Sequence, residues 1–376
     1  MSRPTKATIN LSALRHNLQF ARSITGTKVI GVIKADAYGH GSIPIAQVLE
    51  EQKIECLAVA CIEEAIVLRE AGVQSPILLL EGFYGAAELP IMEHYDLFAV
   101  IQQQEQIDIL NQWKGKPFKV WLKIDTGMHR IGFLPSEFPS AYKQLKESEN
   151  VSQIVLMTHF ACADEPEKPT TIDQIDLFAQ TIEGKAEETC SSNSAGILHW
   201  PEANGNWVRP GLLLYGSSPF TTPHPLADRL KPVMEVTSQI FAIRKLGAGV
   251  PIGYGQTYVT DHPCTVGVVA MGYADGYPRH APSGSPVLVN GQRTRILGRI
   301  SMDMMTIDLT HLPNTKIGDT VMLWGDNLPA TEVAHHAGTI SYELFCNLKR
   351  VPIHYLGEAV SESEQTKYQP VSISPT

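Results

Sequence analysis

Residues 28–34 read KVIGVIK, an uninterrupted apolar run rich in β-branched side chains. This pattern is typical of a strand that is buried on both faces of a parallel sheet. Comparable runs recur at 56–60 (CLAVA), 76–80 (PILLL), 97–101 (LFAVI), 119–124 (KVWLKI), 154–160 (IVLMTHF), 189–193 (TCSSN) and 211–215 (GLLLY), the last two being weaker. Together they make eight strands, which is the number that closes a (β/α)8 barrel.

Helical patterns separate most of these runs, so strands and helices alternate along the chain. One lies at 62–71 (IEEAIVLREA), and another lies at 171–183. A single face of the second carries Ile172, Ile175, Phe178 and Ile182. An opening helix is expected over 10–22, with Asn10 as its N-cap. The alternation favours a TIM-type barrel with helices outside. The alternative, a doubly wound open sheet, is weakened because no G-x-G-x-x-G follows the first strand.

The alternation of strand and helix patterns ends at 216–232 (GSSPFTTPHPLADRLKP), a segment with four prolines. Beyond it, 236–243 (VTSQIFAI) and 317–324 (IGDTVMLW) have strand patterns, and Asn290-Gly291 is a strong type I′ hairpin signal. We therefore expect a barrel domain over 1–232, whose first residues can pair with a mostly β domain over 233–358. A polar tail follows at 359–376.

The 376 residues carry a formal net charge of −9, from 30 Lys plus Arg against 39 Asp plus Glu. This balance argues against a nucleic-acid partner, which would need a basic surface. No segment approaches about 18 consecutive apolar residues, and the start has no signal core, so we expect no membrane association and a cytoplasmic protein. The six cysteines are scattered, which predicts core or near-core thiols and no metal site.

Chemically active side chains gather where the predicted strands end, the edge at which barrel active sites lie. They are Lys34, then Lys123, Asp125 and Arg130, then Thr158-His159, then Asn193-Ser194, and lastly Arg209-Pro210-Gly211 just before the eighth run. Burial lowers the pKa of a lysine amine and suits it to Schiff-base chemistry. A lysine that reaches solvent at the barrel mouth is the simpler alternative for Lys34.

The residues around Lys34 and the last strands are compatible with a phosphate site, although Arg209-Pro210-Gly211 taken alone is more typical of a structural turn. Tyr38, within the glycine-rich turn that follows Lys34, offers a phenol to an anion. Gly211 and Leu212 offer backbone N–H groups, and Ser194 offers a hydroxyl, at the loops that commonly bind phosphate in barrels. A Schiff-base lysine combined with a phosphate cradle suggests pyridoxal phosphate.

The β domain contains three further candidates whose spacing alone favours structural roles. Tyr254 stands between two glycines in PIGYGQTY and needs a cationic or hydrogen-bonding neighbour to act as a base. Tyr273 is explained by a turn, and Met302-Asp303 reads as a core methionine beside a surface aspartate.

In order and spacing, seven motifs resemble the alanine racemases, which are pyridoxal-phosphate enzymes with a barrel followed by a β domain. The motifs are KADAYGHG, KIDTGMHRIGF, THFACADE, WVRPGLLLYG, IGYGQTY, GYADGYPR and GRISMDM, and the match runs from residue 5 to about 356. The resemblance implies that Lys34 forms the internal aldimine and is one of two catalytic bases. The other is Tyr254, supplied by the partner subunit.

The resemblance also implies roles for the remaining site residues. The cofactor phosphate is held by Tyr38, Ser194, Gly211, Leu212 and Tyr342. Arg209 faces the pyridine nitrogen, and His159 bonds to that arginine. Arg130 and the backbone of Met302 hold the substrate carboxylate, while Lys123, carbamylated in many members, positions Arg130. Tyr273 matches part of the access channel, and Asp303 is a supporting residue.

The implied activity is the interconversion of L-alanine and D-alanine by two-base proton transfer in a homodimer with shared active sites, which supplies D-alanine for peptidoglycan. We expect Lys34 to take the α-proton of the D-enantiomer and Tyr254 that of the L-enantiomer. Three alternatives stay open. A racemase of serine or of broad range would use the same bases, a non-catalytic pyridoxal-phosphate-binding protein has a similar barrel, and a related decarboxylase would need a different acid.

Overall fold

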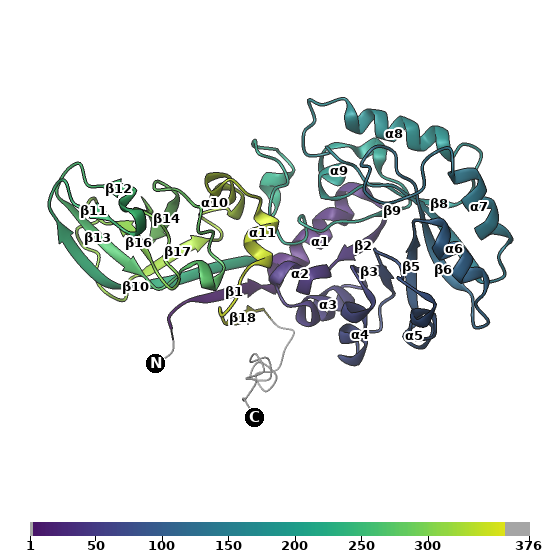
Figure 1. The fold of residues 1–376 in the computed structure, drawn as a ribbon, viewed down its shortest axis with the longest axis horizontal. Helices are drawn as coiled ribbons and strands as arrows, with labels where there is room; N and C mark the ends of the chain where they lie inside the picture. The colour runs from purple at the N-terminus through teal and green to yellow at the C-terminus, as the bar shows by residue number, and fades with distance from the viewer. Residues whose placement is uncertain (1–2, 358–376) are drawn as a thin grey trace. The chain divides into compact units, whose positions relative to one another are not determined.

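The computed structural model describes residues 3–357, so the polar tail expected at 359–376 lies outside the described residues. The chain forms two compact units. The barrel unit comprises Leu14–Lys231 and Ile340–Cys346, and the β unit comprises, within the described residues, 3–13, 232–339 and 347–357. Each is described by itself (Figure 1).

Eight parallel strands close the barrel, which confirms the predicted fold class. They are β2 (Lys28–Val32), β3 (Cys56–Val59), β4 (Ile77–Leu79), β5 (Leu97–Ile101), β6 (Phe118–Lys123), β7 (Val151–Met157), β8 (Glu188–Cys190) and β9 (Trp207–Val208). The barrel closes where Lys28 pairs with Trp207 and Val29 pairs with Val208. Every residue of β3 and β4 is buried, as the continuous apolar runs require.

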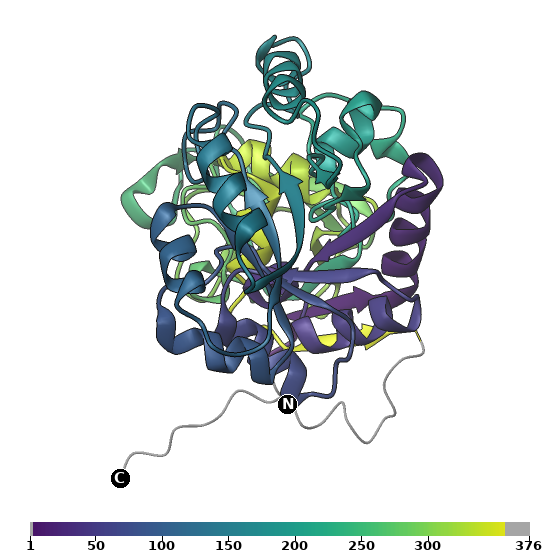
Figure 2. The same cartoon turned by 90° about the vertical axis from the view of Figure 1, so that its right-hand side faces the viewer.

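Helices surround these strands (Figure 2). The longer ones are α1 (Leu11–Thr25), α3 (Ser42–Glu51), α4 (Ile62–Glu70), α6 (Gln104–Asn111), α7 (Phe138–Glu147) and α8 (Thr170–Thr181). Shorter ones are α2 (Lys34–Gly39), η1 (Ala86–Glu88), α5 (Leu89–His94), α9 (Ser194–His199), η2 (Pro201–Ala203), η3 (Ala227–Arg229) and α11 (Ser341–Cys346). Asn10 caps α1 as predicted, because its Oδ1 accepts a hydrogen bond from the Ala13 N–H at 3.1 Å.

The predicted position of the last barrel strand is wrong. It lies at Trp207–Val208, whereas residues 211–215 form successive tight turns, in which the N–H of Leu214 bonds to the carbonyl of Gly211 and that of Tyr215 bonds to Leu212. Their apolar character reflects burial in a turn rather than an extended strand. Arg209, Pro210 and Gly211 therefore follow the last strand instead of preceding it, and so lie at the carboxyl edge of the barrel.

Helix α8 buries only part of the face that its apolar spacing predicts, since Phe178 of that face is buried and Ile172 is not. Ile172 is 49% exposed, and the buried positions are Thr171, Gln174 and Phe178. The buried Gln174 amide is hydrogen-bonded at the barrel edge: its Nε2 donates to Thr126 Oγ1 and to the His159 carbonyl, and its Oε1 accepts from the Ala161 N–H. The buried face of α8 therefore carries the fully hydrogen-bonded amide of Gln174, while Ile172 is exposed.

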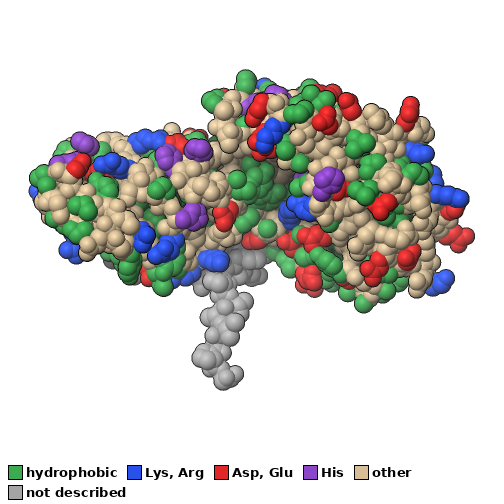
Figure 3. All heavy atoms as spheres, turned by 45° about the horizontal axis from the view of Figure 1, so that its top comes forward, with side chains coloured by type: hydrophobic (Ala, Val, Ile, Leu, Met, Phe, Trp, Pro, Cys, Tyr) green, Lys and Arg blue, Asp and Glu red, His purple; other side chains and the backbone are tan. Residues whose placement is uncertain are grey.

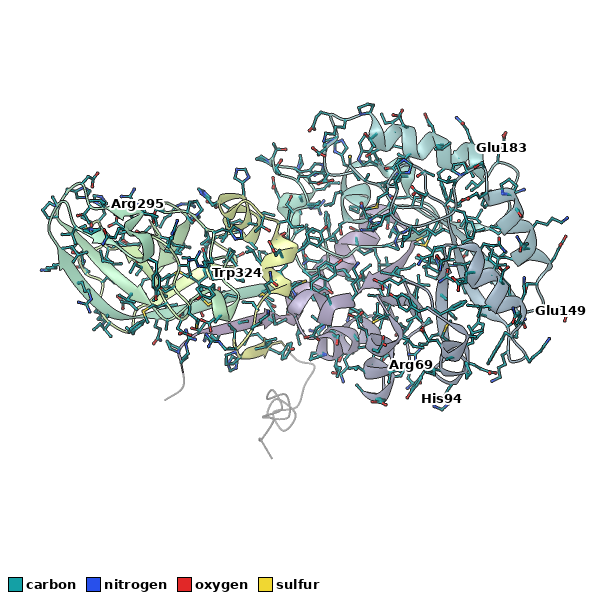
Figure 4. All side chains as sticks on the ribbon, in the orientation of Figure 1. Arg69, His94, Glu149, Glu183, Arg295 and Trp324 are labelled. Carbon is teal, nitrogen blue, oxygen red and sulfur yellow. The ribbon has the colours of Figure 1, made fainter. Side chains whose placement is uncertain are left out.

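At the opposite, amino-terminal edge of the barrel, Arg69 of α4 joins the loops that precede β4 and β5, and it is labelled in Figure 4. Its guanidinium donates to the carbonyls of Val73 and Ser75, before β4, and of Tyr95, before β5, at 2.7, 2.8 and 2.9 Å. These bonds satisfy loop carbonyls at the edge that carries stability rather than chemistry.

The β unit is built on an eight-stranded sheet. Its strands are β1 (Lys6–Asn10), β10 (Met234–Leu246), β13 (Cys264–Val269), β14 (Pro286–Val289), β15 (Gln292–Arg295), β16 (Met305–Asp308), β17 (Thr320–Trp324) and β18 (Ile353–Leu356). The short strands β11 (Pro251–Ile252) and β12 (Tyr258–Val259) pair with each other, and η4 (Tyr254–Gln256), η5 (Tyr273–Asp275) and α10 (Ala330–Ala337) complete the unit. Strand β1 pairs antiparallel with β10 and parallel with β18.

The predicted hairpin is confirmed. Val289 pairs with Gln292 across a two-residue turn, and both turn residues have positive φ, 47° at Asn290 and 81° at Gly291. Trp324, the last residue of β17, is fully buried and is labelled in Figure 4.

The cysteines are free thiols, but Cys346 is exposed, so the prediction of a core or near-core thiol is wrong there. Among residues 3–357, no helix is both long and apolar enough to cross a membrane. On the visible face, acidic and basic side chains are interspersed rather than gathered into a basic stripe (Figure 3).

Candidate active site

Lys34 follows β2 directly after Ile33 and begins a left-handed turn. Four consecutive residues, Ala35, Asp36, Ala37 and Tyr38, have φ between 52° and 55°. Each non-glycine residue in this conformation costs about 1–2 kcal/mol, and such strain collects at ligand-binding sites. Gly39 continues the turn at φ 73°, where a Cβ would lie 2.2 Å from the carbonyl oxygen of Phe345. The turn is therefore held by its tertiary surroundings rather than by local preference.

The turn brings Tyr38 against the loop that follows the last strand. The Tyr38 Oη lies 2.4 Å from the position that a Cβ on Gly211 would take. The Tyr38 ring also packs against Tyr215 and Tyr342, with ring centroids 4.8 and 5.7 Å away. Burial raises the pKa of both Tyr38 and Tyr342, the latter to about 12, so both phenols are protonated hydrogen-bond donors at neutral pH.

Ser194, the first residue of α9, is hydrogen-bonded to the same loop. Its Oγ accepts hydrogen bonds from the N–H groups of Gly211 at 3.0 Å and Leu213 at 3.1 Å. Because these two donors occupy the oxygen, the hydroxyl proton remains available to an anion. Leu212 lies between them and is buried. The five residues predicted to hold a phosphate therefore lie on connected elements of the barrel unit.

Substituting Gly211 with alanine tests this cradle. The new Cβ would displace the Tyr38 phenol, whose ring is confined by Tyr215 and Tyr342, so the pyridoxal phosphate that the sequence motifs imply is expected to bind at least about tenfold more weakly. The measurement is a fluorescence titration of cofactor-free protein. Gly85→Ala is the matched control, since its Cβ would meet nothing within 4 Å. If the Tyr38 oxygen causes the clash, Gly211→Ala should weaken binding much less in a Tyr38→Phe background than in the wild type. An equal effect in both backgrounds would contradict the steric explanation.

Arg209 is buried and fixed at the carboxyl ends of β7 and β8. Its Nη1 donates to the carbonyl and the Sγ of Cys190, and its Nη2 donates to the carbonyls of Thr158 and Ser191. The Nη2 also donates to His159 Nδ1 at 3.0 Å. Since an arginine can only donate, His159 Nδ1 is unprotonated. Burial and the charge of Arg209 hold the pKa of His159 well below its ordinary value, so this imidazole is neutral.

The cationic groups of the barrel edge lower one another's proton affinity. Burial, followed by the charge of Arg130, lowers the pKa of Lys34. Burial and the charges of Arg209 and Arg130 lower that of Lys123 to about 7. A site that holds these groups together suits a ligand with several negative charges, and the pKa of about 7 gives Lys123 a partly neutral amine near physiological pH.

Asp125 shapes the loop that carries Arg130. Its Oδ1 accepts hydrogen bonds from the N–H groups of Gly127, Met128 and His129, each at 3.0 Å. Burial alone would raise the pKa of Asp125, but these backbone donors hold it below its ordinary value. The Asp125 carboxylate therefore stays ionised and holds the backbone of residues 127–129 through these hydrogen bonds.

The remaining candidates belong to the β unit. Tyr254 lies on η4 between Gly253 and Gly255, which have φ of 74° and 70°, and its side chain is 63% exposed. Met302 is 52% exposed and not the core methionine that its pattern suggests.

Tyr273 and Met302 are held together by backbone bonds. The Tyr273 N–H donates to the Ser301 carbonyl, and the Ala274 N–H donates to that of Met302. Asp303 is exposed and pairs with Arg350, Oδ1 to Nη2, at 2.7 Å. The β unit thus places Tyr273, Met302 and Asp303 in one neighbourhood and leaves the Tyr254 phenol open to solvent.

Within the described chain, no group of three or more His, Cys, Asp or Glu side chains could hold a metal ion. Sequence reasoning missed Glu64 and Gln174, which bind backbone groups at the carboxyl edge of the barrel. The sequence marks Glu64 only as an acidic residue in the first turn of a helix, and Gln174 only as a polar residue between apolar ones.

Comparison with known proteins gives a consistent result over both units. Residues 9–219 match the family model for the alanine racemase N-terminal domain, and residues 233–355 match that for the C-terminal domain. A catabolic alanine racemase of Pseudomonas putida is 52% identical over 357 residues, which cover 95% of this chain and 100% of the relative.

Solved structures agree with this match. The biosynthetic alanine racemase of Pseudomonas aeruginosa superposes with a TM-score of 0.92 at 40% identity, over 95% of this chain and 100% of the other. An alanine racemase of Bartonella henselae described with covalently bound pyridoxal phosphate has a TM-score of 0.87 at 30% identity, again over 95% and 100%.

Proposed function

The chain belongs to the alanine racemase family, and we propose that Lys34 and Tyr254 are the two groups that exchange the α-proton when it interconverts L-alanine and D-alanine. The observation that carries this proposal is the position of Lys34. It stands at the carboxyl end of a barrel strand, its pKa is lowered by burial, and a cradle for an anion lies beside it. The exposed Tyr254 phenol supports the second role.

We propose pyridoxal 5'-phosphate as the cofactor, and the residues of the barrel edge fit this group. When bound, it supplies an electron-withdrawing ring that makes the α-proton of an attached amino acid acidic. The Ser194 hydroxyl, the protonated phenols of Tyr38 and Tyr342 and the backbone N–H of Leu212 would form a donor set for its phosphate, and the Gly211 N–H orients the Ser194 hydroxyl by donating to its Oγ. Because Gly211 has no side chain, the Tyr38 phenol can occupy its position beside the loop that follows the last strand.

Arg209 would face the ring nitrogen. An arginine keeps its proton throughout the accessible pH range, and the five hydrogen bonds that the Nη atoms of Arg209 donate hold its guanidinium in place. A permanent cation disfavours protonation of the ring nitrogen and so limits the charge that the ring can accept. This property favours return of the proton to the α-carbon over competing reactions such as transamination.

The substrate carboxylate would be held by Arg130 and by the backbone of Met302. Arg130 lies on the loop whose backbone is bonded to Asp125, and Lys123 is the last residue of β6, just before that loop. With a pKa of about 7, Lys123 has the neutral amine that carbamylation requires. We propose that the modified side chain, like its counterparts in the family, orients the Arg130 guanidinium.

Lys34 would remove the α-proton of D-alanine and Tyr254 that of L-alanine, from opposite faces. We propose that the second base and Met302 come from the β unit of a partner subunit, so that a homodimer holds two shared sites. Both residues are exposed in the single chain, which is the state that a docking surface requires. The product D-alanine would serve peptidoglycan synthesis in the cytoplasm.

The proposal is tested by incubating the cofactor-loaded enzyme with a panel of L-amino acids and separating the enantiomers produced. We expect D-alanine to form far faster than D-serine or any other product, and no amine to form by decarboxylation. Racemisation of serine at the rate of alanine would contradict alanine specificity. Failure to exchange the α-proton of any amino acid in deuterated water would exclude a racemase.

A further inference from the structure

Glu64 links the ends of two neighbouring barrel strands at the edge that carries Lys34. Its Oε1 accepts a hydrogen bond from the Ala35 N–H, and its Oε2 accepts one from the Ala60 N–H, each at 2.7 Å. Ala60 directly follows β3, and Ala35 directly follows Lys34 at the end of β2. These strands are adjacent, with Val32 paired to Ala58. One half-buried carboxylate thus fixes the point at which the chain leaves each strand.

The backbone that Glu64 binds is the strained turn. Ala35 is the first of its four left-handed residues, and such a conformation persists only where the surroundings impose it. The far part of the turn is held by Asp36, whose Oδ1 accepts from the Ser42 N–H at 2.7 Å, and by His40, whose Nδ1 donates to the Tyr38 carbonyl at 2.9 Å. Glu64 holds the beginning, one residue from Lys34.

Glu64 also contributes charge. Burial and Arg130 lower the pKa of Lys34, while the carboxylates of Glu81 and Glu64 oppose this effect. Removing the Glu64 charge would lower the pKa of Lys34 further, so the same side chain affects both the position and the basicity of that amine.

We propose that Glu64 is a positioning residue for the racemase reaction: its bridging carboxylate fixes the left-handed turn and thereby the directions in which Lys34 and Tyr38 leave the backbone. This inference rests on the proposed role of Lys34 as a base. It assigns no contact between Glu64 and the substrate or the cofactor.

Glu64→Gln is the primary test, because an amide of the same shape has one acceptor oxygen and cannot accept at both N–H groups. In the full-length, cofactor-loaded enzyme we expect hydrogen exchange of the Ala35 or Ala60 amide to accelerate about tenfold or more. We also expect kcat to fall about tenfold or more with little change in KM, and the limb of the pH profile that reports Lys34 to move to lower pH.

Glu63→Gln is the matched control. Glu63 is the exposed neighbour in the same helical turn, so this variant removes an equal charge without touching the bridge. It should leave amide exchange and kcat unchanged. Glu64→Asp keeps the charge but shortens the reach, so it should accelerate amide exchange without moving the pH profile, and it serves as a second variant if the glutamine form folds poorly.

Normal amide protection together with a wild-type kcat in Glu64→Gln would overturn the proposal. So would faster exchange with an unchanged kcat, since the bridge would then be structural only. Both results leave Lys34 as the base. By contrast, wild-type racemisation by Lys34→Ala would refute the proposed function itself, so the two failures are distinguishable.

Discussion

Replacing Lys34 with alanine is expected to lower the rate of racemisation by at least about 10⁴-fold, the upper end of the range for a single acid–base residue. The amine has two tasks in the proposed site, covalent attachment of the cofactor and removal of the α-proton of D-alanine. Among the lysines of the described chain, Lys53 lies beyond helix α3 and just before β3, and Lys123 lies at the end of β6, four strands away in the barrel order. A substitute amine in the right position is therefore absent from this part of the chain.

The measurement combines a chiral assay with borohydride reduction, which fixes a Schiff-base cofactor to the lysine that holds it. The alanine variant should retain no covalently bound cofactor and should not exchange the α-proton of either enantiomer with solvent. Lys34→Arg preserves the positive charge without a neutral amine and should be equally inactive. Lys168→Ala, which removes an exposed lysine paired with Glu165, should leave activity unchanged. Covalent retention of cofactor by Lys34→Ala would show that another lysine is attached.

The barrel was predictable because its strands are buried on both faces and therefore read as continuous apolar runs. The same criterion misplaced the last strand, since Leu212, Leu213 and Leu214 are buried in turns and their composition does not distinguish the two cases. Strand Trp207–Val208 is too short to give a pattern of its own. Its pairing with Lys28 and Val29 of β2 and with Cys190 of β8 identifies it.

The location of the candidate site was predictable from the topology of the barrel. Parallel strands bring their carboxyl ends to one edge, so Lys34, Lys123, His159 and Arg209 could be grouped before any contact was known. The left-handed turn was not predictable, because three of its four residues are Ala and Asp, which do not form left-handed runs on their own.

What imposes that turn is a set of contacts distant in sequence. Glu64 binds its beginning, and the Phe345 carbonyl leaves no space for a side chain on Gly39. The net charge of −9 was equally uninformative about the site, since the cations that lower the pKa of Lys34 and Lys123 are concentrated at one edge. Local patterns thus located the site, while tertiary contacts determine its geometry.

Replacing Tyr254 with phenylalanine should reduce racemisation about 10²–10⁴-fold, yet leave one partial reaction intact. L-alanine and D-alanine are equally stable in water, so kcat/KM must fall equally in both directions, and the asymmetry has to be sought in proton exchange. With Lys34 present, D-alanine should still exchange its α-proton in deuterated water with retention of configuration. L-alanine, which depends on the missing phenol, should exchange slowly. Tyr258→Phe, four residues along, is the control and should behave as wild type.

Mixed dimers of these two variants test whether Tyr254 acts in the partner's site. If each site combines Lys34 of one subunit with Tyr254 of the other, a dimer of one Lys34→Ala chain and one Tyr254→Phe chain contains one site with both residues intact. Co-expression with two different affinity tags and sequential purification should yield such dimers, with about half of the wild-type activity. If both residues came from the same chain, every site would lack one of them and no activity would return. Loss of both α-proton exchange reactions in Tyr254→Phe would contradict the two-base assignment.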